Sequence, residues 1–206
     1  MKDGARALVE ALRLREGLLR ITVTPPSEEA RLPGTVAVTA RDLPTIPPEI
    51  VLRVAESVIR VPGPLSRCKT NSRIVEATAL REARRHGAFD AILRNVAGNV
   101  VETSGRNLFV AVGGALRTPS ISEGALEGIT RAAVLELARI DDLTAKETVV
   151  TMDALLRADE VFLTGSGVGV LAVHRVHART FVPTPGPLTA RLAAAYERIL
   201  GRESSW

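Results

Sequence analysis

Two residues of this chain, Lys69 and Glu102, could supply an amine and a carboxylate to the same reaction. A lysine amine can form an imine with an aldehyde, but it attacks only in its uncharged form, which needs a suitable environment. Lys69 is one of three lysines, with Lys2 and Lys146, in a chain whose other strong bases are arginines. Arginine cannot form an imine, so Lys69 points to this chemistry, although a lysine by itself is most often a solvated surface residue.

Four short motifs follow one another along the chain at specific spacings. They read KTNSR at 69–73, ETSGRNLF at 102–109, LRTP at 116–119 and LEGITR at 126–131. In this order they resemble the class IV aminotransferases, which are also called fold-type IV pyridoxal phosphate (PLP) enzymes. That family includes branched-chain and D-amino-acid aminotransferases and 4-amino-4-deoxychorismate lyase.

The resemblance implies PLP as the coenzyme and assigns both reactive groups to it. Lys69 would carry PLP as an imine and would act as general acid and base. Glu102 would lie against the pyridine nitrogen, because PLP withdraws electrons well only while that nitrogen stays protonated. Asn107 would support the local turn. The alternatives are an exposed acid at the end of a strand for Glu102 and a plain turn asparagine for Asn107.

The coenzyme phosphate needs hydrogen-bond donors, and two segments could provide them. A helix expected at 130–138 would direct the N–H groups of Ile129 and Thr130, together with the Thr130 hydroxyl, at the phosphate. By resemblance, Leu126 of the same motif also contacts the coenzyme, and Ser166 in a glycine-rich stretch supplies a second hydroxyl. The alternatives are an ordinary threonine cap and a plain glycine-rich loop.

The sequence departs from the family pattern in two places. Family members carry a further N-terminal segment, ahead of the part that matches residue 5 here, with an arginine on the coenzyme phosphate; no residue of this sequence matches that arginine. Branched-chain members also have a tyrosine a few residues after the lysine, where this chain has Arg73 and Ile74. A lysine followed four residues later by arginine resembles the aminodeoxychorismate lyases more closely.

We therefore expect a PLP-dependent lyase that converts 4-amino-4-deoxychorismate to 4-aminobenzoate and pyruvate in folate biosynthesis. A D-amino-acid or branched-chain aminotransferase is the first alternative, because it would use Lys69 and Glu102 in the same roles. A truncated, catalytically silent relative is the second alternative, since the matching N-terminal segment is missing. In the two enzymatic cases the partner is a small amino-acid-like molecule, and the resemblance implies a homodimer.

Composition argues against several other classes of function. The chain has 206 residues, a net charge of +4 and six aromatic residues, without a run of like charges, so we expect no nucleic-acid partner. The sequence shows no signal core and no apolar run of about 20 residues, so we expect no membrane association and a cytoplasmic protein. Cys68 has no partner for a disulfide. His174 and His177 lack a third ligand nearby, so we expect no metal.

The pattern of apolar residues predicts a mixture of helices and strands, and hence an α+β fold. The expected helices are 5–16, 73–86, 130–138, 152–157 and 187–200. The expected strands are 18–24, 34–40, 50–54 extended by 57–59, 91–94, 99–102, 107–112, 115–118, 147–150, 160–164 and 174–177. Proline-rich links at 44–48 and 62–64 predict a partial N-terminal α/β domain at 1–64, followed by a C-terminal PLP-binding domain at 65–206 with a mixed, barrel-like sheet.

Overall fold

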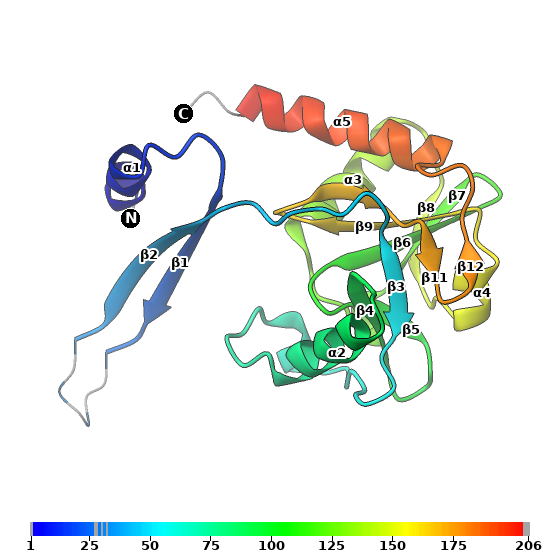
Figure 1. Ribbon diagram of the computed structural model, residues 1–206, viewed down its shortest axis with the longest axis horizontal. Helices are drawn as coiled ribbons and strands as arrows, with labels where there is room; N and C mark the ends of the chain where they lie inside the picture. The colour runs from blue at the N-terminus through cyan, green and yellow to red at the C-terminus, as the bar shows by residue number, and fades with distance from the viewer. Residues whose placement is uncertain (1, 27–28, 30, 32, 204–206) are drawn as a thin grey trace. The chain divides into compact units, whose positions relative to one another are not determined.

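The computed structural model describes residues 2–26, 29, 31 and 33–203, and the chain forms two compact units, Met1–Thr45 and Ile46–Trp206 (Figure 1). The first unit contains helix α1 (Lys2–Ala11) and an antiparallel hairpin of β1 (Leu18–Thr24) and β2 (Thr35–Arg41). Helix α1 ends before the predicted residue 16, because Arg13 adopts a φ of 49° that a right-handed helix cannot continue through.

The first sheet of the second unit has five strands in the order β12-β11-β3-β4-β5. These strands are β3 (Val51–Val54), β4 (Asp90–Arg94), β5 (Val100–Thr103), β11 (Arg175–Val176) and β12 (Arg179–Thr180). Strand β3 runs parallel to both of its neighbours, while the outer pairs are antiparallel. The sheet therefore joins segments that lie more than a hundred residues apart.

The second sheet has the order β10-β9-β6-β7-β8. Its strands are β6 (Asn107–Val112), β7 (Ala115–Pro119), β8 (Ala145–Thr148), β9 (Glu160–Gly165) and β10 (Gly169–Ala172). Only the β7–β8 pair is parallel. The two mixed sheets, together with the helices, confirm the predicted α+β class. The chain crosses from one sheet to the other between Thr103 and Asn107, which places this short loop beside both.

Helices cover these sheets and complete their cores. They are α2 (Ile74–Arg85), α3 (Ile129–Ile140), α4 (Met152–Leu156) and α5 (Pro187–Glu203), with short 3-10 turns η1 (Pro64–Arg67) and η2 (Ile121–Glu123). Ala79 and Ala83 of α2 pack on β4, and α3 and α5 pack on the second sheet. No helix among the described residues is both long and apolar enough to span a bilayer.

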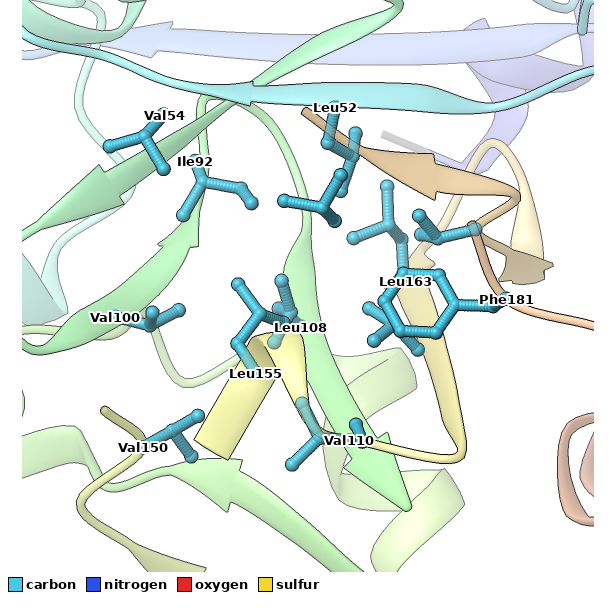
Figure 2. Close-up of a cluster of buried hydrophobic side chains, with 14 of the residues drawn as sticks. Leu52, Val54, Ile92, Val100, Leu108, Val110, Val150, Leu155, Leu163 and Phe181 are labelled. Carbon is cyan, nitrogen blue, oxygen red and sulfur yellow. The ribbon is translucent and has the colours of Figure 1, made fainter. Parts of the chain in front are cut away.

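A hydrophobic core lies between the two sheets of the second unit (Figure 2). Leu52 and Ile92 come from the first sheet, and Leu108 and Leu163 come from the second. Leu155 of α4 is fully buried in the same cluster. Successive side chains of a strand point to opposite faces of its sheet, so the strand period accounts for the core residues that the two sheets contribute.

Replacing Leu155 by alanine tests this core. The change removes buried methyl groups and leaves a cavity, so we expect the free energy of unfolding to fall by about 2–5 kcal/mol. Urea unfolding followed by circular dichroism measures the loss. Val182→Ala is the matched control, because Val182 is 80% exposed and its truncation should change stability by less than about 0.5 kcal/mol. Equal effects of the two changes would contradict the assignment of the core.

Within residues 46–64, the structure differs from the prediction in the length of one strand. Strand β3 stops at Val54, without the predicted extension to 57–59, because the N–H groups of Glu56 and Ser57 donate to the Glu82 carboxylate of α2 at 2.9 and 3.1 Å. The first compact unit ends at Thr45, and the domain boundary at residue 64 stays a prediction from the proline pattern. Pairing of β3 with β4 and β11 incorporates residues 46–64 into the second unit.

Candidate active site

A cavity of about 750 Å³ in the second unit brings the predicted site residues together. Five separate segments line it: residues 59–61, the approach to α2 with its first turn, the loop between β5 and β6, the start of α3, and the end of β9. All seven candidate residues are among its walls, namely Lys69, Glu102, Asn107, Leu126, Ile129, Thr130 and Ser166. This shared location is compatible with the roles assigned by resemblance, which remain predictions.

Lys69 lies in the connection between η1 and α2 and lines the cavity. Pro64 begins η1, and the turn ends at Cys68, so Lys69 is in the connection rather than inside a helix. The side chain is exposed. Its positive charge nevertheless acts on Glu102, because it favours the ionised carboxylate and so lowers the pKa of Glu102. The amine and the acid are therefore within electrostatic reach of each other across one cavity.

Glu102 is buried at the end of β5 and is only 6% exposed. Its Oε2 accepts hydrogen bonds from the Leu126 N–H at 3.1 Å and from Asn107 Nδ2 at 3.2 Å. Its Oε1 lies 3.3 Å from Arg60 Nη2. An exposed acid at the end of a strand, which was the alternative for this residue, is thus inconsistent with the structure.

Burial raises the pKa of Glu102 to about 7, because the ionised form loses its hydration. The Leu126 N–H and the Arg60 guanidinium oppose this change, while Glu76 adds to it. The Arg60 ion pair is compatible with the raised pKa because Arg60 also pairs with Glu76, so its charge is shared between two carboxylates. A cationic ring nitrogen in the cavity would supply the missing positive charge.

The raised pKa predicts how stability depends on pH in the coenzyme-free protein. The native state holds the Glu102 proton more tightly than the unfolded chain, whose ordinary value is 4.5. Stability from this group is therefore fully present below pH 4.5 and is lost as the pH rises to about 7, by up to about 3 kcal/mol. Urea unfolding at several pH values in this window should show a flatter profile for Glu102→Gln. Identical profiles would contradict the prediction.

Asn107 connects the acid to the loop before α3. Its Nδ2 donates to the Leu126 carbonyl at 2.8 Å as well as to Glu102. A plain turn asparagine would not donate to a carbonyl 19 residues further along the chain while it also holds Glu102. Gly128 leaves the space for this side chain, since a Cβ there would stand 2.0 Å from Asn107 Oδ1.

Gly128→Ala should therefore displace Asn107 and loosen the support of Glu102. The backbone of Gly128, with φ −75° and ψ 136°, suits alanine, so the effect comes from the clash alone. We expect a loss of about 1–3 kcal/mol in unfolding free energy and about tenfold weaker PLP binding, measured by thermal unfolding and by spectroscopic titration. Gly4→Ala is the control, because nothing lies within 4 Å of the added methyl group. Unchanged PLP affinity in Gly128→Ala would contradict the role of Asn107.

The start of α3 offers hydrogen-bond donors to the cavity. Gly128 is the N-cap and provides no side-chain cap, so the ordinary threonine cap considered for Thr130 does not occur. The Thr130 hydroxyl is buried, 3.4 Å from the Tyr196 hydroxyl. Thr164 Oγ1 is buried, has no hydrogen-bond partner among the described residues, and belongs to a residue that lines the cavity. This donor set fits a phosphate group, and the cavity as a whole fits PLP.

Two further residues, which the sequence did not single out, contact the candidate site in the structure. Arg60 donates to the carbonyls of Gly124 and Ser66 at 3.2 and 3.0 Å, besides its ion pairs with Glu76 and Glu102. Arg60 thereby connects three segments that line the cavity, those of Ser66, Glu76 and Glu102. A single arginine before a proline-rich link gives no local pattern that could have identified it.

Asp90 is the second such residue, and it is fully buried at the start of β4. It accepts hydrogen bonds from Thr103 Oγ1 at 2.9 Å and from the Ser104 N–H at 3.2 Å, and it pairs with Arg106 at 2.6 Å. These three residues form the loop between Glu102 and Asn107. Asp90 therefore fixes the loop that joins Glu102 to Asn107. In the sequence, the one feature that could have identified Asp90 is its position as an acid at the start of an apolar strand.

His174 and His177 have structural contacts. His174 Nδ1 accepts a hydrogen bond from the Ile50 N–H at 3.0 Å, and His177 Nε2 accepts one from the Val54 N–H at 3.3 Å. Burial lowers the pKa of His177, which favours the neutral acceptor. Within the described parts of the chain, no group of three metal-ligating side chains occurs.

Comparison with known proteins identifies the family. The model of amino-transferase class IV matches residues 1–176, so the chain belongs to the class IV aminotransferase family. PLP is the coenzyme of this family, as the resemblance of the motifs implies. The fold-type IV assignment is also confirmed, because the Escherichia coli branched-chain amino acid aminotransferase structure superposes with a TM-score of 0.86 at 26% identity, over 99% of this chain and 73% of that one.

Two curated relatives show how much of a family member this chain covers. A probable branched-chain-amino-acid aminotransferase of Thermotoga maritima is 38% identical over 138 residues, which is 65% of this chain and 50% of the relative. A D-alanine aminotransferase of Bacillus licheniformis is 30% identical over 213 aligned positions, 100% of this chain and 75% of the relative. The chain thus spans about half the length of the Thermotoga relative that it matches.

Proposed function

We propose that this chain is the catalytic part of a PLP-dependent aminotransferase that acts on small amino acids. One observation carries the proposal: the Lys69 amine, the buried Glu102 carboxylate and the uncapped start of α3 line a single cavity. These are the three groups that PLP requires, namely an amine for its aldehyde, an acid for its ring nitrogen and donors for its phosphate.

Each group would hold a different part of the coenzyme. Lys69 Nζ would attach it covalently, Glu102 would accept a hydrogen bond from its protonated ring nitrogen, and the N–H groups of Ile129 and Thr130 with the Ser166 hydroxyl would hold its phosphate. When bound, PLP withdraws electrons from the substrate carbon that carries the amino group and makes its proton removable. Lys69 Nζ would remove that proton and release it to the coenzyme rather than to the substrate carbon, and the apolar side chain of Leu126 would limit the access of water.

The relatives favour amino transfer over the lyase reaction that the lysine–arginine spacing suggests. Both curated relatives described above are named as aminotransferases, of the branched-chain and D-alanine types, and neither is named as a lyase. The lyase remains a second candidate, because Arg73 and Ile74 occupy the place of the branched-chain tyrosine. We also propose a homodimer, following the family.

The test is a direct comparison of the two reactions. The purified chain is supplied with PLP and assayed for transfer from leucine and from D-alanine to 2-oxoglutarate, and separately for pyruvate release from 4-amino-4-deoxychorismate. We expect a visible absorption band from the bound coenzyme, and amino transfer from at least one donor. Pyruvate release without transfer would replace the proposal by the lyase, and a colourless protein that takes up no PLP would leave only a silent relative.

A further inference from the structure

Five cationic side chains line the cavity, and three of them are neutralised by carboxylates of the same unit. Arg60 pairs with Glu76 and Glu102, Arg67 pairs with Glu127, and Arg106 pairs with Asp90. The fourth cation is Lys69, which we assign to the coenzyme. The fifth is Arg73.

Arg73 differs from the other arginines of the cavity in its hydrogen-bond acceptor. Its Nη2 donates to the backbone carbonyl of Ser104, a neutral acceptor. Within the part of the chain that the structure describes, no carboxylate lies within 4.0 Å of its guanidinium. The Arg73 guanidinium therefore lines the cavity with a charge that no carboxylate of the described residues pairs with, and an anion in the cavity could do so.

The position of Arg73 is fixed by both ends of its side chain. Its backbone is the N-cap of α2, four residues after Lys69, and its guanidinium lies over Gly105 in the loop that follows Glu102. A Cβ at Gly105 would stand 4.0 Å from Nη2, so the missing side chain leaves this face open. Asp90 accepts a hydrogen bond from the Ser104 N–H. This contact fixes the position of the Ser104 carbonyl, which orients the Arg73 guanidinium.

We propose that Arg73 is the specificity-determining residue that binds a carboxylate of the substrate, beside the amine that binds the coenzyme. Guanidinium groups bind carboxylates with two parallel hydrogen bonds, and one hydrogen bond to Ser104 leaves other N–H groups free to do so. The inference rests on the proposed function, because it takes the cavity as the substrate site. The substrates that it assigns to that site are amino acids and 2-oxo acids whose own carboxylate is bound by Arg73.

Binding of non-reacting acids tests this inference separately from catalysis. Glutarate, which has two carboxylates, and valerate, which has one, are titrated into the PLP-supplied protein and followed by calorimetry. We compare the wild type with Arg73→Gln, which removes the charge but keeps a donor for Ser104, and with Arg73→Lys, which keeps the charge. Arg67→Gln is the matched control, because it removes an equal charge from the same cavity wall, one already paired with Glu127. Circular dichroism confirms that each variant is folded.

We expect Arg73→Gln to bind glutarate about tenfold or more weakly, Arg73→Lys to recover part of the affinity, and Arg67→Gln to stay within about twofold of the wild type. A loss confined to glutarate assigns Arg73 to a side-chain carboxylate, and an equal loss for valerate assigns it to the carboxylate beside the amino group. Unchanged glutarate affinity in Arg73→Gln, or an equal loss in Arg67→Gln, overturns the inference. If acid binding depends on Arg73 but no amino transfer is found, the proposed function fails, and Arg73 keeps the role of binding a carboxylate in this cavity.

Discussion

Lys69→Arg is expected to abolish amino transfer, lowering the rate by about four orders of magnitude or more. Arginine keeps the positive charge at the mouth of the cavity but cannot form an imine, so both covalent attachment and proton transfer at this position are lost. Borohydride reduction of the PLP-supplied wild type, followed by peptide mass spectrometry, should place the coenzyme adduct on Lys69. The variant should show no adduct and no activity above background.

Lys146→Arg is the control for this experiment. Lys146 is exposed on β8, outside the cavity lining, so its replacement should leave the adduct and the rate unchanged. An adduct on Lys146, or a Lys69→Arg variant with a rate within tenfold of the wild type, would show that another amine carries the coenzyme. The location of Lys69 in the cavity wall would then be unrelated to the chemistry.

Glu102→Gln is expected to have the second largest effect, a loss of about 100-fold or more in kcat at neutral pH. Glutamine fits the same space and can still contact Leu126 and Asn107, but it cannot hold a ring nitrogen in its protonated form by charge. The absorption spectrum of the bound coenzyme and the pH profile of kcat should both change. A purely structural role for Glu102 would lower the folded fraction without altering the spectrum of the folded protein.

Glu127→Gln separates this effect from a general loss of negative charge near the cavity. Glu127 lines the same cavity but is half exposed and pairs only with Arg67 among the described residues. Its replacement should change kcat by less than about threefold, since exposed ion pairs contribute little. Similar losses in Glu102→Gln and Glu127→Gln would argue against ring-nitrogen pairing as the function of Glu102.

The residues changed in these two experiments, Lys69 and Glu102, are both identified by the order of the motifs along the chain. A catalytic lysine and its coenzyme acid are recognisable because each needs a particular residue type at a particular place in a local motif. The same holds for the turns at Gly98 and at Gly113 and Gly114, where positive φ angles require glycine, and the hairpins around them form as predicted.

The support of the site could not be read from the sequence. Arg60 reaches Glu102 across 42 positions, and Asp90 reaches Arg106 across 16, so neither contact leaves a local pattern. The predicted strand at 57–59 fails for the same reason, because Glu82 of a distant helix captures the backbone N–H groups that a strand would need. The hydrogen bonds of buried polar groups must be satisfied by whatever the fold brings near them.

The sequence by itself therefore determined the class of fold, the family and the set of residues that could perform the chemistry, since residue type and short-range period are local properties. Only the tertiary structure decided that these residues share one cavity, that Glu102 is buried enough to raise its pKa to about 7, and that Arg73 is left without a carboxylate among the described residues. Burial and ion pairing depend on distance in space, and folding sets those distances between segments that the sequence keeps far apart.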